Sequence, residues 1–263
     1  MRYDLAKMVG ARPRKRLVLR PIEPPPALAA PLESEAAGII GAIHTAIAEI
    51  LLPAYEPRPA VTSDSVDSLG GALEGVREIG QRLAATVSGR LSRWAVRVEE
   101  WHRMRFIGAV KAGTGVDIVA FLTSQEALDQ TQAAVRWASS LITNVAEDLL
   151  QTIDNRVWTA YAGGTPRREL GKQLSEDLGI ARGRANRIAI DQTTKLASNL
   201  DQMRQQEAGI AKYEWRKSGK KHARKEHVAR NGKEFRWDDP PADGHPGQAI
   251  FCGCRAMPVL DLD

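Results

Sequence analysis

The sequence predicts an α+β fold that is predominantly α, with an extended N-terminal arm, a helical bundle and a small C-terminal β-hairpin module. Apolar residues recur at steps of three and four through most of residues 34–209, which is the period of an amphipathic helix. Apolar and polar residues alternate only after residue 210, where turn-forming residues also gather. Basic residues and prolines dominate the start of the chain. We therefore predict four regions, with boundaries at 1–33, 34–122, 123–209 and 210–263.

The composition allows a globular protein with an anionic partner and argues against a membrane or secretory fate. The 263 residues are enough for one large domain or two modest ones. The net charge of +5 and the pI near 9.3 favour an acidic partner or simply a cation-rich surface. We find no apolar run of about eighteen residues and no signal-peptide core, so we expect no membrane partner. The two cysteines lie one residue apart, which strains a disulfide, so a reducing compartment is expected.

The N-terminal arm is strongly basic. Residues 1–20 contain seven basic residues against one acidic, and a proline-rich stretch follows. Such a segment buries too little apolar surface to offset the entropy of ordering it, so we expect an extended arm in isolation. The arm could be a solvated tail, or it could lie along a neighbouring subunit or nucleic acid. Its candidate contacts are Arg12, Arg14, Lys15 and Arg16.

The first helical region contains two predicted helices. Ser34 is the expected N-cap of the first, and Pro53 is expected to end it and to begin a linker. A second apolar stripe runs from Leu69 to Trp101 and predicts one helix of roughly 50 Å, at about 1.5 Å per residue. Several glycines and serines lower the helix propensity of this stripe, so it needs a packing partner.

The second helical region predicts three helices. The first starts just after Thr123 and ends near Gly164. Pro166 suits the first turn of the next helix, and Gly179 is expected to end it. The last covers residues 180–208. Helix, short turn and helix can form a DNA-binding element, and the same pattern also forms a plain corner of a bundle.

The terminal module predicts a small antiparallel sheet. Residues 210–215 alternate as a half-buried strand does. Asn231 and Gly232 then supply a hairpin turn, and residues 235–237 place two aromatic rings on one face of the returning strand. A last apolar run covers residues 249–260.

A basic stretch inside this module is a candidate surface for phosphate or for an acidic partner. Between Arg216 and Arg236, basic residues outnumber acidic ones nine to two. With Trp215 and Trp237 nearby, the stretch could bind a nucleic-acid backbone without sequence preference. A solvated loop is the other interpretation. The candidate contacts are Lys217, Lys220, Lys221, Arg224 and Lys225.

Four histidine and cysteine side chains of the module are candidate zinc ligands. Thiolate and imidazole are ligands that zinc prefers, and an ion would stabilise a small sheet with little core. Cysteines one residue apart point to opposite sides of a strand, so both can bind one ion only if the chain bends, for which Gly253 gives an opportunity. The alternative is that a cysteine packs in the core while the histidines form hydrogen bonds. The candidate ligands are His227, His245, Cys252 and Cys254.

A metal-dependent nuclease of the HNH type is an alternative that uses some of the same residues. His222 or His227, then Asn231 and His245, occur in the order of that motif. However, the proline- and glycine-rich run before His245 forbids the helix that should present this histidine, and no acidic or histidine pair precedes the general base. No nucleotide-binding loop or nucleophile elbow is present either, so we predict a protein that is not an enzyme.

Several rare residues recur in a fixed order near the end of the chain. They are Tyr213-x-Trp215, Arg224-x-x-His227, Gly232, His245-Pro246-Gly247-Gln248, and Cys252-x-Cys254-Arg255 with Pro258-Val259. This order and spacing resemble the terminal signature of the phage Mu F-like head-morphogenesis proteins, over roughly the last hundred residues. Upstream, Ala185, Ile188 and Ala189 agree with a helix of that family, whereas residues 190–192 replace its Arg-Thr-acidic triplet.

The resemblance implies a structural minor capsid protein of a tailed phage that joins the procapsid during assembly. It implies a position at or near the portal vertex and an influence on DNA packaging or ejection. The implied partners are the portal protein and the major capsid or scaffold protein, with double-stranded DNA as a further candidate. The implied location is the virion, with the host cytoplasm during assembly. A plain, non-specific DNA-binding module is a second alternative.

Overall fold

The computed structural model describes residues 3–10, 15–57, 63–122 and 125–262 and divides the chain into two compact units. We call the first the sheet unit. It comprises Met1–Ala29, Ser92–Ala134 and Ile190–Asp263. The second, the helical unit, comprises Ala30–Leu91 and Val135–Ala189. The predicted α+β, predominantly α, fold is confirmed. Each unit is built from separate segments of the chain, whereas the four predicted regions follow one another along the sequence.

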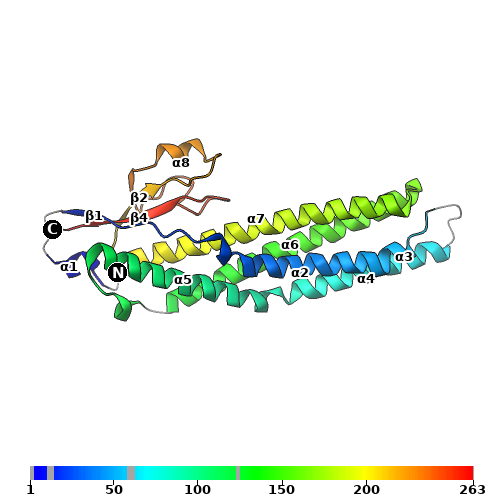
Figure 1. Ribbon diagram of the computed structural model, residues 1–263, viewed down its shortest axis with the longest axis horizontal. Coiled ribbons are helices and arrows are strands. Elements are labelled where there is room, and N and C mark those ends of the chain that lie inside the picture. The colour runs from blue at the N-terminus through cyan, green and yellow to red at the C-terminus, as the bar shows by residue number, and fades with distance from the viewer. Residues whose placement is uncertain (1–2, 11–14, 58–62, 123–124, 263) are drawn as a thin grey trace. The chain divides into compact units, whose positions relative to one another are not determined.

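Long helices supply most of the structure (Figure 1). The division between the units falls within three of them, namely α5, α6 and α7. Between residues 30 and 207, the described α-helices are α2 (Ala30–Ala46), α3 (Leu52–Ala54), α4 (Ser63–Ala85), α5 (Val87–Thr114), α6 (Gln125–Gly163) and α7 (Arg167–Glu207), and the short α1 (Leu5–Met8) precedes them. A π-helical turn, Ile47–Leu51, joins α2 to α3.

A close approach at Gly80 fixes the packing of the helical unit. A Cβ atom at Gly80 would lie 3.1 Å from Ile43 Cδ1 of α2 and 3.0 Å from Leu150 Cδ1 of α6. The absence of a side chain therefore lets α4 pack closely against both neighbours. At one end of the unit, the Tyr55 hydroxyl donates to the Thr165 carbonyl oxygen over 2.7 Å, so the end of α3 is tied to the start of α7.

Three helix boundaries differ from the prediction. The stripe from Leu69 to Trp101 forms two helices that are separated at Thr86, whose hydroxyl bonds to the carbonyl oxygens of Arg82 and Leu83 at 3.4 and 3.1 Å. Conversely, α7 continues through Gly179, so the predicted helix-turn-helix is wrong. The first helix begins at Ala30 and not at Ser34, and the predicted cap at Thr123 or Ser124 lies outside the described residues.

One helix in the described residues is long and apolar enough to cross a membrane, which differs from the expectation that no such run exists. It covers Ala30–Ala54 and has a mean hydropathy of 1.6. A core helix meets the same description, and this one packs an apolar stripe into the helical unit. The buried residues of that stripe include Leu32, Ile39, Ile43, Ile47 and Leu51.

The sheet unit holds a four-stranded antiparallel sheet in the order β1-β4-β2-β3. Its strands are β1 (Arg16–Val18), β2 (Lys212–Arg216), β3 (Glu234–Arg236) and β4 (Arg255–Asp261), and the short helix α8 (Lys225–Ala229) lies between β2 and β3 in the sequence. Tyr213 and Trp215 are buried, whereas the residues between and beside them are not. The alternation predicted for the first strand is therefore confirmed, as is its pairing with the strand after Gly232.

The N-terminal segment is not a detached arm in the structure. Figure 1 shows its strand β1 beside β4, and Arg16 is the register partner of Asp261. The Tyr3 and Leu5 amides donate to the carbonyl oxygens of Glu207 and Ala208 at 3.2 and 3.0 Å. Composition alone favoured a free arm because the partner strand lies more than two hundred residues away in the sequence.

We predict that Gly179→Ala raises the free energy of unfolding by about 0.5–1 kcal/mol, because Gly179 lies inside a helix and an added Cβ meets open space. Gly164→Ala is the matched control. Its φ of +65° disfavours an L side chain, so we expect a loss of about 1–2 kcal/mol. Chemical denaturation of both variants measures the two changes. A loss of stability in Gly179→Ala would indicate a turn at this position.

Candidate functional site

Two buried charges on α7 hold the loop that precedes β4. The Lys195 ammonium nitrogen lies 2.9 Å from the Gln248 carbonyl oxygen and 3.0 Å from that of Ala249, and it pairs with the Asp191 carboxylate at 3.4 Å. Asp191 in turn accepts a hydrogen bond from the Phe251 amide over 2.7 Å. Both side chains are at least 93% buried, since the exposed fractions are 5% and 7%. Each charge is therefore compensated by the loop that it holds.

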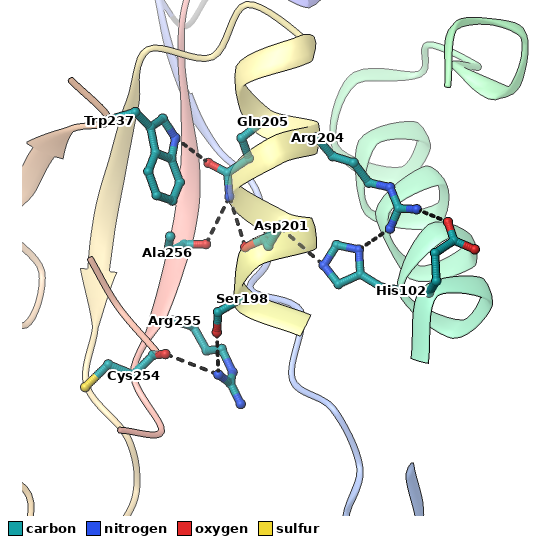
Figure 2. A network of polar contacts seen from close by, with 10 residues as sticks. His102, Ser198, Asp201, Arg204, Gln205, Trp237, Cys254, Arg255 and Ala256 are labelled. Atoms are coloured by element: carbon teal, nitrogen blue, oxygen red, sulfur yellow. Dashed lines mark hydrogen bonds and ion pairs between the residues drawn. The ribbon is translucent and has the colours of Figure 1, made fainter. Parts of the chain in front are cut away.

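A second set of polar contacts joins α7 to the sheet (Figure 2). The Gln205 side-chain amide donates to Asp201 at 3.0 Å and to the Ala256 carbonyl oxygen of β4 at 3.4 Å, and its oxygen accepts from the Trp237 indole at 3.3 Å. The Arg255 guanidinium donates to the Ser198 hydroxyl at 3.3 Å. These contacts join a helix face and a strand through buried and half-buried side chains.

A chain of buried titratable groups crosses from α7 to α5. Arg204 pairs with Glu99 and donates to His102 Nδ1 over 2.5 Å, and His102 Nε2 faces Asp201 at 3.7 Å (Figure 2). Burial, together with the charges of Arg204 and Arg255, holds the pKa of His102 well below its usual range. Burial also raises the pKa of Asp201 to about 7. His102 is therefore neutral, with Nδ1 as acceptor, and Asp201 titrates near neutrality.

Three of the four predicted zinc ligands come together. His227 lies on α8, and the two cysteines lie in the irregular segment just before β4. His227 Nδ1 is 3.4 Å from Cys252 Sγ and 3.5 Å from Cys254 Sγ. All three ligand atoms lie within 4.8 Å of one another, and all three residues are buried. This group is of a kind that could hold a metal ion.

His245, the fourth predicted ligand, belongs to a different contact. Its Nδ1 is 3.0 Å from the Tyr213 hydroxyl, and its ring lies 4.8 Å from the Trp237 ring, centroid to centroid. Burial lowers the pKa of His245, which keeps the ring neutral. The predicted alternative role of a hydrogen-bonded core histidine therefore describes His245.

Asp243 orients the His227 ring. Its carboxylate lies 2.8 Å from His227 Nε2 and accepts from the Arg230 guanidinium over 2.5 Å. Although burial acts to raise it, the hydrogen bonds from His227 and Arg230 lower the pKa of Asp243. An ionised Asp243 needs a proton on Nε2, which leaves the lone pair of Nδ1 directed at the two sulfur atoms.

The pKa values of the two cysteines shift in opposite directions. A hydrogen bond from the Cys254 thiol lowers the pKa of Cys252 to about 5 in spite of burial, and the Cys254 and Gly247 amides contribute to the shift. The same hydrogen bond, with burial, raises the pKa of Cys254. The pair therefore keeps one of its two thiol protons and loses the other at low pH, so one thiolate is present at neutral pH.

The candidate basic contacts divide into two groups. Lys220 donates to the Phe251 carbonyl oxygen at 2.7 Å and Arg224 to that of Ile250 at 2.8 Å, so these two side chains hold the same loop that Lys195 holds. The other three are exposed, and none forms an ion pair within the part of the chain that the structure describes. They are Lys217, Lys221 and Lys225.

The remaining candidate contacts lie in the N-terminal segment. Lys15 is exposed. Arg16 pairs with Glu214 at 3.0 Å and with Glu234 at 2.6 Å, so its charge is compensated within the sheet. Arg12 and Arg14 lie outside the described residues.

The residues proposed for the nuclease alternative do not assemble into one group. Asn231 accepts from the Lys217 amide at 2.9 Å, and His245 contacts Tyr213. His222 is exposed at the surface beside the cysteines.

Sequence reasoning missed the polar residues that organise this region. Asp191 and Lys195 have the spacing of a surface ion pair on a helix, and only the burial of the whole face distinguishes them. Asp243 lies in a proline- and glycine-rich run, where an aspartate is an ordinary turn residue. The one available signal was the departure from the family triplet at residues 190–192, because Asp191 lies within it.

We predict that Asp201→Asn flattens the dependence of stability on pH between about 4 and 7. The raised pKa of Asp201 means that the folded protein binds more protons than the unfolded chain in this window, so stability falls as pH rises. Asparagine mimics the protonated carboxyl and removes this loss, which amounts to the order of a few kcal/mol. Denaturation of both proteins from pH 4 to pH 8 measures the difference. A stability gap that stays constant across that range would show that Asp201 ionises normally.

The chain is similar to known proteins over part of its length. Residues 151–257 match the family described as Phage Mu protein F like protein. The chain is also 36% identical, over 155 residues, to an uncharacterized protein of Haemophilus influenzae. That alignment covers 58% of this chain and 34% of the relative, so the chain spans about a third of the relative's length. No solved structure matches the chain. Residues 151–257 are therefore a region of the Phage Mu protein F-like family.

Proposed function

We propose that this protein is a structural minor capsid component that acts in the morphogenesis of a phage head. The match to the Phage Mu protein F-like family over residues 151–257 carries the proposal. That family consists generally of structural proteins without enzymatic activity. The proposed location is the virion, after assembly in the host cytoplasm.

The architecture supports a role in assembly. The matched region takes in the end of α6, all of α7 and most of the sheet. In the sheet unit, buried polar contacts from α7 hold the loop before β4, and His227 of α8 lies beside the two cysteines that precede β4. Such a rigid module suits a protein that presents a fixed surface to a partner subunit.

The proposed partners are the portal protein and the major capsid or scaffold protein, with the chain at or near the portal vertex. DNA is the further proposed contact, through the exposed lysines of the basic stretch. Lys217, Lys221 and Lys225 carry this proposal, because Lys220 and Arg224 already bind carbonyl oxygens of the protein. Charge reversal at those two positions would disturb the loop and DNA binding together.

We predict that the protein sediments with immature heads of the phage that encodes it. The test compares procapsids purified from a host that carries the intact gene with those from a host that carries a deletion, by mass spectrometry and electron microscopy. Heads that contain the protein and that lose infectivity or regular shape without it would support the proposal. Its absence from both heads and isolated portal would contradict it.

We also predict that the variant Lys217→Glu, Lys221→Glu, Lys225→Glu binds double-stranded DNA more weakly than the wild type. Each lost phosphate contact should reduce the slope of log K against log salt by about one. A matched control carries the same charge change at the exposed residues Arg93, Arg97 and Arg182. Fluorescence anisotropy at about 50 mM salt measures both. Equal losses in the two variants would show that only net charge matters, and no wild-type binding would remove DNA as a partner.

A further inference from the structure

The three buried ligand atoms of the sheet unit have the spacing of a zinc site. Zinc binds thiolate at about 2.3 Å and imidazole nitrogen at about 2.0–2.1 Å, so a tetrahedral angle separates these two ligand atoms by about 3.6 Å. His227 Nδ1 lies 3.4 Å from Cys252 Sγ and 3.5 Å from Cys254 Sγ. The ligand atoms therefore need only small shifts to bind one ion.

The His227 ring is fixed in the orientation that a metal requires. Asp243 occupies Nε2, and Arg230 holds Asp243 in turn. The Trp215 ring packs edge-on against the His227 ring, with the centroids 5.1 Å apart. A carboxylate is one of the common partners of the far nitrogen of a ligand histidine in zinc proteins, and it sets the tautomer and raises the basicity of the binding nitrogen.

The backbone bends so that both cysteines face the same histidine. Phe251 has a φ of +56°, which is rare for a residue with a side chain and costs about 1–2 kcal/mol. Its amide and carbonyl are both held, by Asp191 and Lys220 respectively. A Cβ atom at Gly253 would lie 3.0 Å from Ser218 Cβ, so the glycine lets the loop before α8 pass close to the two sulfur atoms.

Both cysteines are free thiols and are buried, so no disulfide competes for the two sulfur atoms.

A single nucleophilic cysteine would explain less of this geometry. The Cys252 thiol contacts His227, and His227 contacts Asp243, which is the arrangement of a thiol catalytic triad. However, Cys254 lies at nearly the same distance from the same nitrogen, and the exposed fractions of the two cysteines are only 3% and 1%. Two sulfur atoms that share one imidazole lone pair suit a metal ion better than an attacking group.

We infer that His227, Cys252 and Cys254 bind one zinc ion, with the fourth coordination position open to solvent. A pocket of about 280 Å³ leads to these residues and is lined in part by Lys220, His222 and Arg224. It supplies an entry path for the ion and room for a water ligand. The inference stands independently of head assembly. Its consequence is that the ion joins α8 to the segment before β4 and stabilises a module whose aromatic core is small.

The test is elemental analysis of the untagged full-length chain, purified without chelator and dialysed. We expect about one zinc ion per chain. Cys252→Ser and His227→Gln should each reduce the content to a small fraction, because each removes a ligand. His245→Phe and His222→Ala are the matched controls and should keep the ion. Asp243→Asn should weaken zinc binding by roughly 10- to 100-fold in a chelator competition.

Measurements on the unmodified protein remain informative if a variant fails to fold. Cobalt should give the thiolate charge-transfer and tetrahedral ligand-field absorption of a site with two sulfur ligands, and zinc should slow alkylation of both cysteines. Three results would overturn the inference: a protein without zinc that takes up none when it is added, loss of the ion in His245→Phe, or unchanged content in Cys252→Ser. Loss of zinc in His222→Ala would indicate that His222 is a fourth ligand, which would contradict a fourth coordination position open to solvent. None of these results bears on whether the chain enters heads.

Discussion

The C-terminal part of α7 buries charged and polar side chains that only the terminal module can satisfy. Lys195 would lose the carbonyl oxygens of Gln248 and Ala249 if the loop before β4 moved away, and Asp191 would lose the Phe251 amide. Each buried polar group that loses its hydrogen-bond partner costs about 1–3 kcal/mol. Separating the sheet from this helix would therefore cost a large part of the stability of an ordinary domain.

This constraint explains why the loop at residues 248–251 can carry strained backbone. Asp191 and Lys195 hold it from α7, and Lys220 and Arg224 hold it from the loop before α8. The positive φ of Phe251 then persists because the surrounding contacts determine it. The same bend directs Cys252 and Cys254 to His227, so the charged contacts of α7 and the sulfur ligands depend on one piece of backbone.

Local patterns in the sequence predicted the parts of the structure that depend on neighbouring residues. The alternation at Tyr213 and Trp215 gave the central strand, and the glycine at 164, with φ of +65°, marks the end of α6. Gly179 misled the prediction because a glycine costs a helix only about 1 kcal/mol, which packing of the flanking turns offsets. The pairing of β1 with β4 could not be predicted, since short strands far apart in the sequence carry no register signal.

Some features of the candidate site could likewise be predicted from the sequence, and others could not. The residue types of His227, Cys252 and Cys254 indicated a metal site, and their convergence needed only the bend that Gly253 allows. The exclusion of His245 and the role of Asp243 both depend on the path of an irregular loop, which composition does not determine. The burial of Asp201 and Arg204 could not be predicted from the sequence either, because both residues fit the polar face of an amphipathic helix.

Native-state hydrogen exchange tests most directly whether α7 and the terminal module are one cooperative unit. The account predicts that the amides of β2 and β4 and those of residues 190–207 exchange with the same opening free energy, close to that of global unfolding of the sheet unit. Much faster exchange of the β2 and β4 amides, while residues 190–207 stay protected, would contradict it.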